Sequence, residues 1–278
     1  MPKFIVHSPI GYCFGVSKAL EKTRETILNN RDKQIVLYRP LVHNKYTESK
    51  LLEYENVSIY KSDKTYDKDA IFIFSAHGMN EDDKAFLKNN NYINYLDTTC
   101  PFLEETKDKI LSYLSEDKKV VFVGKTNHPE TKFITSISKK IKFYDVKNLK
   151  EITFKEDEYV IPQSTISKID FDILKEKIPN KDQLLTICRQ CLYRWEQSLK
   201  VEKSNSLCFL VCGDSSSSNS IEFYNLLVSK GYLTYFVQNE EEATKLKNEL
   251  SKYETVHVVS ATSFPKELVD SIVSILES

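Results

Sequence analysis

Three cysteines recur at almost equal intervals along this chain. Cys13, Cys100 and Cys188 are separated by 87 and 88 residues. Each follows a short β-rich run and precedes a segment with the periodicity of an amphipathic helix. A spacing that recurs together with its flanking pattern indicates an internal repeat. We therefore expect three similar modules that each bring one cysteine to a common site.

Three thiolates at one site limit which metal ions or metal clusters can bind there. Soft thiolates select zinc, copper(I) or iron–sulfur clusters. Structural zinc usually takes four ligands, often from two CxxC pairs, and this chain has one such pair, Cys188 and Cys191, which is also typical of a thioredoxin-like redox motif. A four-iron cluster on Cys13, Cys100 and Cys188 leaves one iron without a protein ligand, open to a substrate oxygen. We expect Cys191 and the two cysteines of the apolar run 207–212 to be packing residues.

The segments between the cysteines alternate between β-rich runs and helical patterns, which predicts parallel α/β sheets. We expect an α/β fold of three modules with mainly parallel sheets of about four strands each, in a pseudo-threefold arrangement around the site. The modules are expected at residues 1–99, 100–184 and 185–278, with room for the N-terminal strand to pack on the third. The helices after the cysteines are expected at 16–30, 101–116 and 189–203, and a strand before the third cysteine at 183–187.

Polar side chains follow the β-rich runs at matching distances from the cysteines. In open α/β sheets a ligand lies beyond the carboxyl ends of the strands. A set of mostly uncharged hydrogen-bond donors beside helix N-termini suits a phosphate or diphosphate. A serine run alone is more often simply a loop. The expected anion-binding residues are His43, His77, Ser217, Ser218, Asn219 and Ser263.

One acidic residue stands out in these loops. Glu130 follows His128 and Pro129, and proline suits the first turn of a helix. A carboxylic acid there can deliver protons to a substrate, helped by His128. The alternative is a helix-start glutamate favoured by the macrodipole.

The composition excludes several classes of protein. The 278 residues carry a net charge of −1, which argues against a nucleic-acid-binding surface. No apolar run approaches the roughly 20 residues of a membrane span, and the N-terminus reads as a strand rather than a signal peptide. We expect a cytoplasmic protein with six reduced cysteines.

Eight short motifs appear in one order along the chain: GYCFGV, VHN, SAHG, TTCP, GKTNHPE, PQST, TIC and SSSSNS. In these motifs and their order the chain resembles the 4-hydroxy-3-methylbut-2-enyl diphosphate reductase family over nearly its whole length. That family carries out the last step of the methylerythritol phosphate route to isoprenoid precursors.

The resemblance implies a fold and a mechanism. It implies three α/β modules around a central [4Fe-4S] cluster, with Cys13, Cys100 and Cys188 as ligands. It implies that two electrons and two protons remove the substrate's allylic hydroxyl as water, giving isopentenyl and dimethylallyl diphosphate. An external donor such as ferredoxin or flavodoxin would supply the electrons.

The resemblance also implies roles for the remaining site residues. Glu130 corresponds to the proton relay, with His128 beside it and also among the substrate-binding residues. The family's hydroxyl residue near the substrate alcohol usually lies in a Gln-Thr-Thr stretch, which here reads Gln163, Ser164 and Thr165. The diphosphate contacts correspond to the six anion-binding residues named above.

Two other functions remain as alternatives. A dehydratase would use the open iron only as a Lewis acid, and its turnover would need no reductant. A non-enzymatic sensor with a labile cluster would need neither Glu130 nor a diphosphate pocket.

Overall fold

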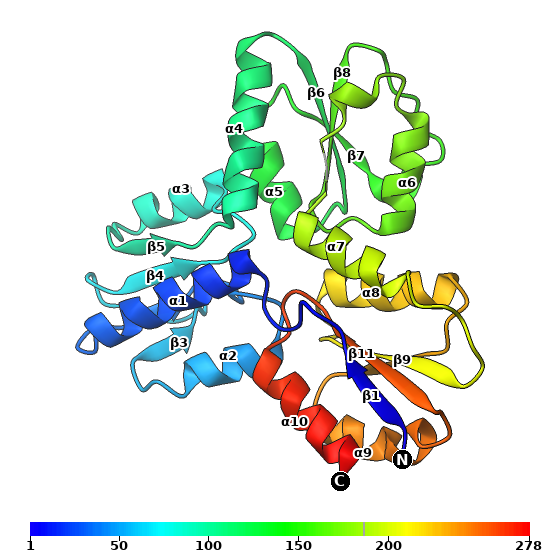
Figure 1. Cartoon of the computed structure of the whole chain (residues 1–278). Helices are drawn as coiled ribbons and strands as arrows, with labels where there is room; N and C mark the ends of the chain where they lie inside the picture. Colours follow the sequence, from blue (N-terminus) through cyan, green and yellow to red (C-terminus); the bar gives the residue numbers. More distant parts are fainter. Residues whose placement is uncertain (186) are drawn as a thin grey trace.

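Three parallel β-sheets, each flanked by helices, surround a common centre in the computed structural model (Figure 1). The structure describes residues 1–185 and 187–278. Its inner strands are rich in Val, Ile and Phe and are buried almost throughout, which is typical of parallel sheets covered on both faces, whereas most of the strands at the sheet edges are only partly buried. The expected α/β fold of three parallel sheets is confirmed.

The first sheet has four strands, in the order β3-β2-β4-β5. They are β3 (Val57–Ile59), β2 (Ile35–Leu37), β4 (Ile71–Phe74) and β5 (Tyr95–Asp97). The helices of this region are α1 (Phe14–Asn29), α2 (Lys45–Leu52) and α3 (Glu81–Asn89). Leu20 and Ile27 of α1 pack on the sheet. A capping box at Asn80 and Asp83 fixes the start of α3.

The second sheet has three strands, in the order β7-β6-β8. They are β7 (Lys142–Asp145), β6 (Lys119–Gly124) and β8 (Glu158–Pro162). The helices are α4 (Pro101–Ser115), α5 (Pro129–Ser136) and α6 (Lys168–Lys177). Helices α4 and α5 begin with proline, whose missing N–H costs nothing in the first turn.

The third sheet has the order β1-β11-β9-β10 and joins the two ends of the chain. Its strands are β1 (Lys3–Val6), β11 (Thr255–Ser260), β9 (Leu207–Cys212) and β10 (Thr234–Val237). The helices are α7 (Arg189–Ser198), α8 (Ser218–Ser229), α9 (Glu240–Leu250) and α10 (Lys266–Glu277). One apolar cluster continues from this region into the second and includes Trp195, Phe209 and Phe171.

The strand before each cysteine belongs to the preceding sheet in the ring. β5 pairs with β4 in the first sheet, while Leu184 bridges to Val160 of β8 in the second. β1 pairs with β11 in the third sheet, which closes the ring. Each cysteine therefore stands where the chain leaves one sheet and enters the helix that leads to the next.

Two expectations about element length are wrong. In the expected strand 183–187, Thr186 lies outside the described residues. Among the others, Leu184 forms an isolated bridge rather than part of a strand, directly after a 3₁₀ turn at Lys181–Gln183 that Asn180 caps. Helix α7 ends at Ser198 instead of 203. The Tyr232 hydroxyl donates to the Val201 carbonyl at 2.6 Å and holds that segment in a turn.

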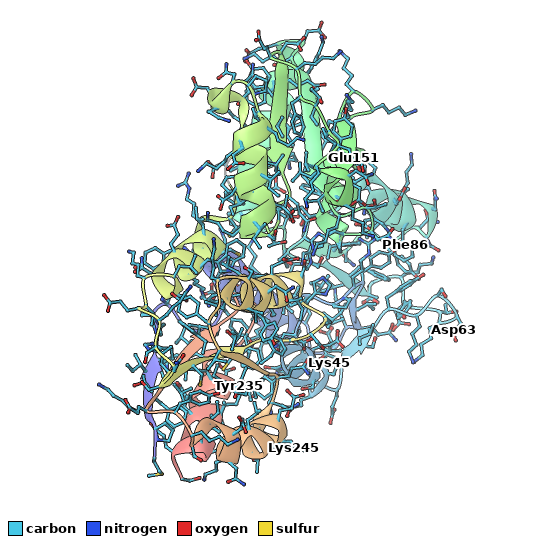
Figure 2. All side chains as sticks on the ribbon, turned by 90° about the vertical axis from the view of Figure 1, so that its right-hand side faces the viewer. Lys45, Asp63, Phe86, Glu151, Tyr235 and Lys245 are labelled. Atoms are coloured by element: carbon cyan, nitrogen blue, oxygen red, sulfur yellow. The ribbon has the colours of Figure 1, made fainter. Side chains whose placement is uncertain are left out.

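Charged side chains cover the outer side of every sheet region, where Asp63, Glu151 and Lys245 are exposed (Figure 2). Within the described residues, none of the helices combines the length and the apolarity needed to cross a membrane.

Candidate functional site

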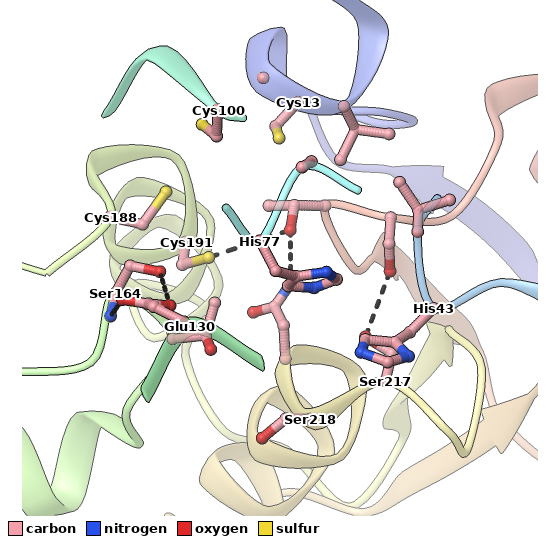
Figure 3. Close-up of a pocket in the computed structure, with 18 of the residues that line it drawn as sticks. Cys13, His43, His77, Cys100, Glu130, Ser164, Cys188, Cys191, Ser217 and Ser218 are labelled. Atoms are coloured by element: carbon pink, nitrogen blue, oxygen red, sulfur yellow. Dashed lines mark hydrogen bonds between the residues drawn. The ribbon is translucent and has the colours of Figure 1, made fainter. Parts of the chain in front are cut away.

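The carboxyl ends of strands from all three sheets open onto one cavity at the centre of the molecule (Figure 3). It brings together every site residue expected from the sequence. These are Cys13, His43, His77, Cys100, His128, Glu130, Ser164, Thr165, Cys188, Ser217, Ser218, Asn219 and Ser263. In Figure 3 the cysteines gather on one side and His43, Ser217 and Ser218 on the other.

Each of the three cysteines is the N-cap of a helix, and its backbone amide is anchored in the same way. The amide donates to a carbonyl in the loop that follows a strand of the preceding sheet, namely β11, β4 or β8. The bonds run from Cys13 to Thr262 at 2.9 Å, from Cys100 to Ala76 at 3.0 Å and from Cys188 to Ser164 at 2.9 Å. This shared arrangement gives the site its threefold character.

Two opposing effects act on the pKa values of the three thiols. The backbone N–H groups two and three residues further along each helix favour the thiolate, as expected at a helix N-terminus. Burial acts against it, raising the pKa of Cys13 and raising that of Cys100 to about 11. At the third position the Cys191 thiol donates to Cys188, which lowers the pKa of Cys188 and raises that of Cys191.

Two glycines flank Cys13 for different reasons. Gly11 has a φ of +86°, a conformation that side chains with a Cβ rarely adopt. Gly15 lies against the second cysteine, where an added Cβ would be 2.4 Å from the Cys100 sulfur. The approach of α1 to Cys100 therefore requires glycine at position 15.

Among the described residues, no three His, Cys, Asp or Glu side chains form a group that could hold a single metal ion. Cys13, Cys100 and Cys188 line one cavity, and thiolates are the usual ligands of iron–sulfur clusters.

Three histidines form a cluster on the opposite side of the cavity. Their ring centroids are 4.7 Å apart for His43 and His77, 5.7 Å for His77 and His128, and 6.5 Å for His43 and His128. Burial lowers all three pKa values, that of His77 well below its usual range and that of His128 to about 4. The cluster is therefore uncharged at neutral pH, and an anion bound beside it would favour its protonation.

The start of α8 supplies hydroxyl and amide groups. Ser217 caps the helix and lies 3.2 Å from the Ser263 hydroxyl, oxygen to oxygen. Asn219 is buried; its Nδ2 donates to the Thr262 hydroxyl at 2.7 Å, while its Oδ1 has no partner in the described part of the chain. With His128, the N-cap of α5, also lining the cavity, this edge suits an anionic ligand.

Glu130 is buried, with 2% of its surface exposed. Its carboxylate accepts hydrogen bonds from the Ser164 amide and the Ser164 hydroxyl, both at 2.6 Å. Burial raises the pKa of Glu130 to about 7, even though both bonds favour the carboxylate. A carboxyl group with a pKa near 7 can both give and accept protons at physiological pH.

The sequence did not reveal several residues of the site. Lys125 donates to Ser218 at 2.6 Å and to Glu222 at 2.8 Å, which places a cation at the rim. Thr262 links Asn219 to Cys191, whose sulfur also borders the cavity. Lys125 lies within the GKTNHPE motif, whereas no local pattern marks Thr262.

Comparison with known proteins identifies related chains. The family model described as LytB protein matches residues 4–277. A 4-hydroxy-3-methylbut-2-enyl diphosphate reductase from Wolbachia pipientis subsp. Culex pipiens (strain wPip) is 28% identical over 289 residues, covering 99% of this chain and 92% of the relative. The enzyme of the same name from Nautilia profundicola is 28% identical over 273 residues, covering 95% of each chain.

Two solved structures share the fold. The E-1-hydroxy-2-methyl-but-2-enyl-4-diphosphate reductase from Plasmodium falciparum matches with a TM-score of 0.84 and 22% identity, covering 100% of this chain and 88% of that one. A structure of (E)-4-hydroxy-3-methyl-but-2-enyl diphosphate reductase matches with a TM-score of 0.66 and 21% identity, covering 100% and 99%.

Substituting alanine for Gly15 tests the geometry of the cysteine wall. The new methyl group would meet the Cys100 sulfur at 2.4 Å and displace it. We expect Gly15→Ala to lower the iron content after anaerobic reconstitution, although alanine favours the helix itself by about 1 kcal/mol. Ser17→Ala, an exposed change in the same turn, is the control and should keep full iron content. Equal iron in both variants would contradict this account of Gly15.

Proposed function

Because this chain belongs to the LytB protein family, we propose that it is a 4-hydroxy-3-methylbut-2-enyl diphosphate reductase, the activity named for its relatives. The reaction consumes two electrons and two protons. It breaks the allylic C–O bond, releases the hydroxyl oxygen as water and leaves isopentenyl or dimethylallyl diphosphate.

One observation supports this proposal above all. A single cavity joins three helix-start cysteines, a cluster of uncharged histidines and a buried carboxyl group with a pKa near 7. A sensor protein with an iron–sulfur cluster would need neither the Glu130 carboxyl group nor an anion-binding edge. The presence of both in one cavity favours an enzyme.

Cys13, Cys100 and Cys188 would hold a [4Fe-4S] cluster with one iron lacking a protein ligand. The donor set fits it, because thiolates are the usual ligands and backbone N–H groups surround each sulfur. Gly15 leaves the space that a Cβ would fill beside Cys100. When bound, the cluster would supply electrons and Lewis acidity toward the substrate's hydroxyl oxygen.

The opposite edge of the cavity would bind the diphosphate. His43, His77 and His128 become better donors as the anion raises their pKa values. Ser217, Ser218, Asn219 and Ser263 add neutral donors beside the N-terminus of α8. This fixes the substrate with its phosphates on the histidines and its alcohol toward the cysteines.

Glu130 would provide the protons. Its carboxyl group is shielded from solvent and bound to the Ser164 hydroxyl, so Ser164 can pass a proton between Glu130 and the substrate alcohol. Thr165 lines the same wall, and His128, whose Nδ1 accepts from the Glu130 amide at 3.2 Å, holds the start of that helix.

Two further parts of the proposal concern the whole chain. The repeating modules would comprise residues 1–99, 100–184 and 185–278, with β1 completing the third sheet. An external one-electron donor such as ferredoxin or flavodoxin would supply the electrons, since the reaction consumes two in each turnover.

Alanine substitution of single cysteines tests the ligand assignment. Cys13→Ala, Cys100→Ala and Cys188→Ala should each lose most of the iron after anaerobic reconstitution, because each removes one of three ligands. Cys191→Ala is the matched control from the same helix turn and should retain it. A Cys191→Ala protein without iron beside a Cys188→Ala protein with iron would overturn the third assignment.

Substrate binding to histidine variants tests the anion edge. Removing one charge-assisted contact costs about 1.5–3 kcal/mol, so His43→Ala and His77→Ala should each weaken binding by roughly ten- to a hundred-fold. His7→Ala is the control, because His7 pairs with His257 at 2.7 Å outside the cavity. Anaerobic calorimetry measures the affinities. Unchanged affinity in both cavity variants would refute the diphosphate site.

The pH dependence of turnover tests Glu130. Its pKa is raised, so the acid is present below about pH 7 and is lost as the pH rises through that value. Turnover should fall on the alkaline side in the wild type. Glu130→Gln should lose roughly 10²- to 10⁴-fold in turnover, together with that alkaline limb, while keeping its iron and substrate affinity.

Ser164→Ala provides the second arm of this test. The Ser164 hydroxyl stabilises the carboxylate and so lowers the pKa of Glu130. Without it the pKa rises, and the alkaline limb should move to higher pH. An unmoved limb in Ser164→Ala, or near-normal turnover in Glu130→Gln, would assign the proton source elsewhere.

A further inference from the structure

Arg194 is a buried cation without an acidic partner. Only 5% of its surface is exposed, and an arginine keeps its charge inside a protein. No ion pair of Arg194 occurs among the residues that the structure describes. Buried charges are normally paired, since leaving water costs several kcal/mol or more. The position therefore calls for a compensating negative charge.

The guanidinium is held by neutral acceptors. Nη1 donates to the Ser260 carbonyl at 2.8 Å, the Ser260 hydroxyl at 3.0 Å and the Ala261 carbonyl at 3.2 Å. Nη2 donates to the Gly11 carbonyl at 2.7 Å. Nε has no partner among the described residues. These bonds fix the orientation of the side chain but do not neutralise its charge.

Burial lowers the pKa of Arg194, and the titratable groups that act against this shift are the thiols of Cys191, Cys13 and Cys188. Arg194 lies on α7, the helix that begins at Cys188, and its bond to Gly11 reaches the loop that carries Cys13. The arginine thus bridges the segments that present two of the three proposed ligands.

We propose that Arg194 is the fixed counter-charge of the group bound by the three cysteines, a positioning residue that favours the reduced state of that group. The inference rests on the proposed [4Fe-4S] cluster. A cation held inside the protein interacts strongly with charge at a nearby buried site. Reduction adds a negative charge to the cluster, and local charge is one of the levers that set its potential.

Substitutions separate the charge from the hydrogen bonds. Arg194→Met removes the charge and keeps much of the apolar volume. Arg194→Lys keeps the charge but cannot reproduce the forked bonds to Ser260 and Gly11. Ser260→Ala removes one acceptor and leaves the charge in place, so it controls for the loss of a single bond.

The experiment is an anaerobic redox titration of each reconstituted full-length protein, followed by the electron paramagnetic resonance of its cluster. We expect Arg194→Met to make reduction at least about tenfold less favourable, which corresponds to 59 mV for one electron. Arg194→Lys and Ser260→Ala should stay close to the wild-type midpoint. An unshifted midpoint in Arg194→Met, or an equal shift in Arg194→Lys, would overturn the inference.

If Arg194→Met takes up no cluster, the iron content of the variants tests the counter-charge instead. Arg194→Gln, a neutral donor, then joins the comparison. Clusters in Arg194→Lys but not in the neutral variants support the counter-charge, and equal loss in Arg194→Lys contradicts it. A wild-type chain that binds no cluster would refute the proposed function itself, whereas an intact cluster with an unshifted midpoint in Arg194→Met refutes only the role of Arg194.

Discussion

The site depends on one repeated contact, the hydrogen bond from the backbone amide of each helix-start cysteine to a carbonyl in a neighbouring strand-end loop. It occurs at Cys13, Cys100 and Cys188 with lengths of 2.9 to 3.0 Å. Because each bond joins the start of one module's helix to the preceding sheet, the three bonds fix the modules around the cavity. The pairing of β1 with β11 follows from the same constraint, since it brings the N-terminal loop to Thr262.

Electrostatics gives the two sides of the cavity different properties. Burial keeps the histidine cluster uncharged and raises the pKa of Glu130 to about 7. The buried Asp214 has a lowered pKa despite its burial, because Ser216 and the Lys45 amide donate to its carboxylate, and its charge acts on His43. An entering diphosphate then meets donors whose protonation it promotes. On the sulfur side the only buried permanent cation in contact with the cysteine loops, among the described residues, is Arg194.

The sequence predicted the parts of this site that depend on local pattern. The intervals between Cys13, Cys100 and Cys188 implied three modules, and the helix-start context of each cysteine implied a shared edge. Glu130 was found because Pro129 marks a helix start, and His128 because it follows a β-rich run at a matching distance from its cysteine. These features are encoded within a few residues of the functional group.

What the sequence could not predict depends on contacts between distant segments. Arg194 reads as an ordinary helix residue until the chain is folded, because its acceptors lie 66 to 183 residues away. The pairing of Ser164 with Glu130 joins two loops 34 residues apart. The end of α7 was misplaced because Tyr232, 31 residues further along the chain, donates to the carbonyl of Val201.

The proposed function depends on a [4Fe-4S] cluster that Cys13, Cys100 and Cys188 would hold, with one iron left open to the substrate's hydroxyl oxygen. Mössbauer spectroscopy of the protein reconstituted with ⁵⁷Fe, with and without 4-hydroxy-3-methylbut-2-enyl diphosphate, tests it most directly. The account predicts a minority iron signal that differs from the signals of the cysteine-bound irons. Only this minority signal should change when substrate is added. Four equivalent irons, or a spectrum that substrate leaves unchanged, would contradict it.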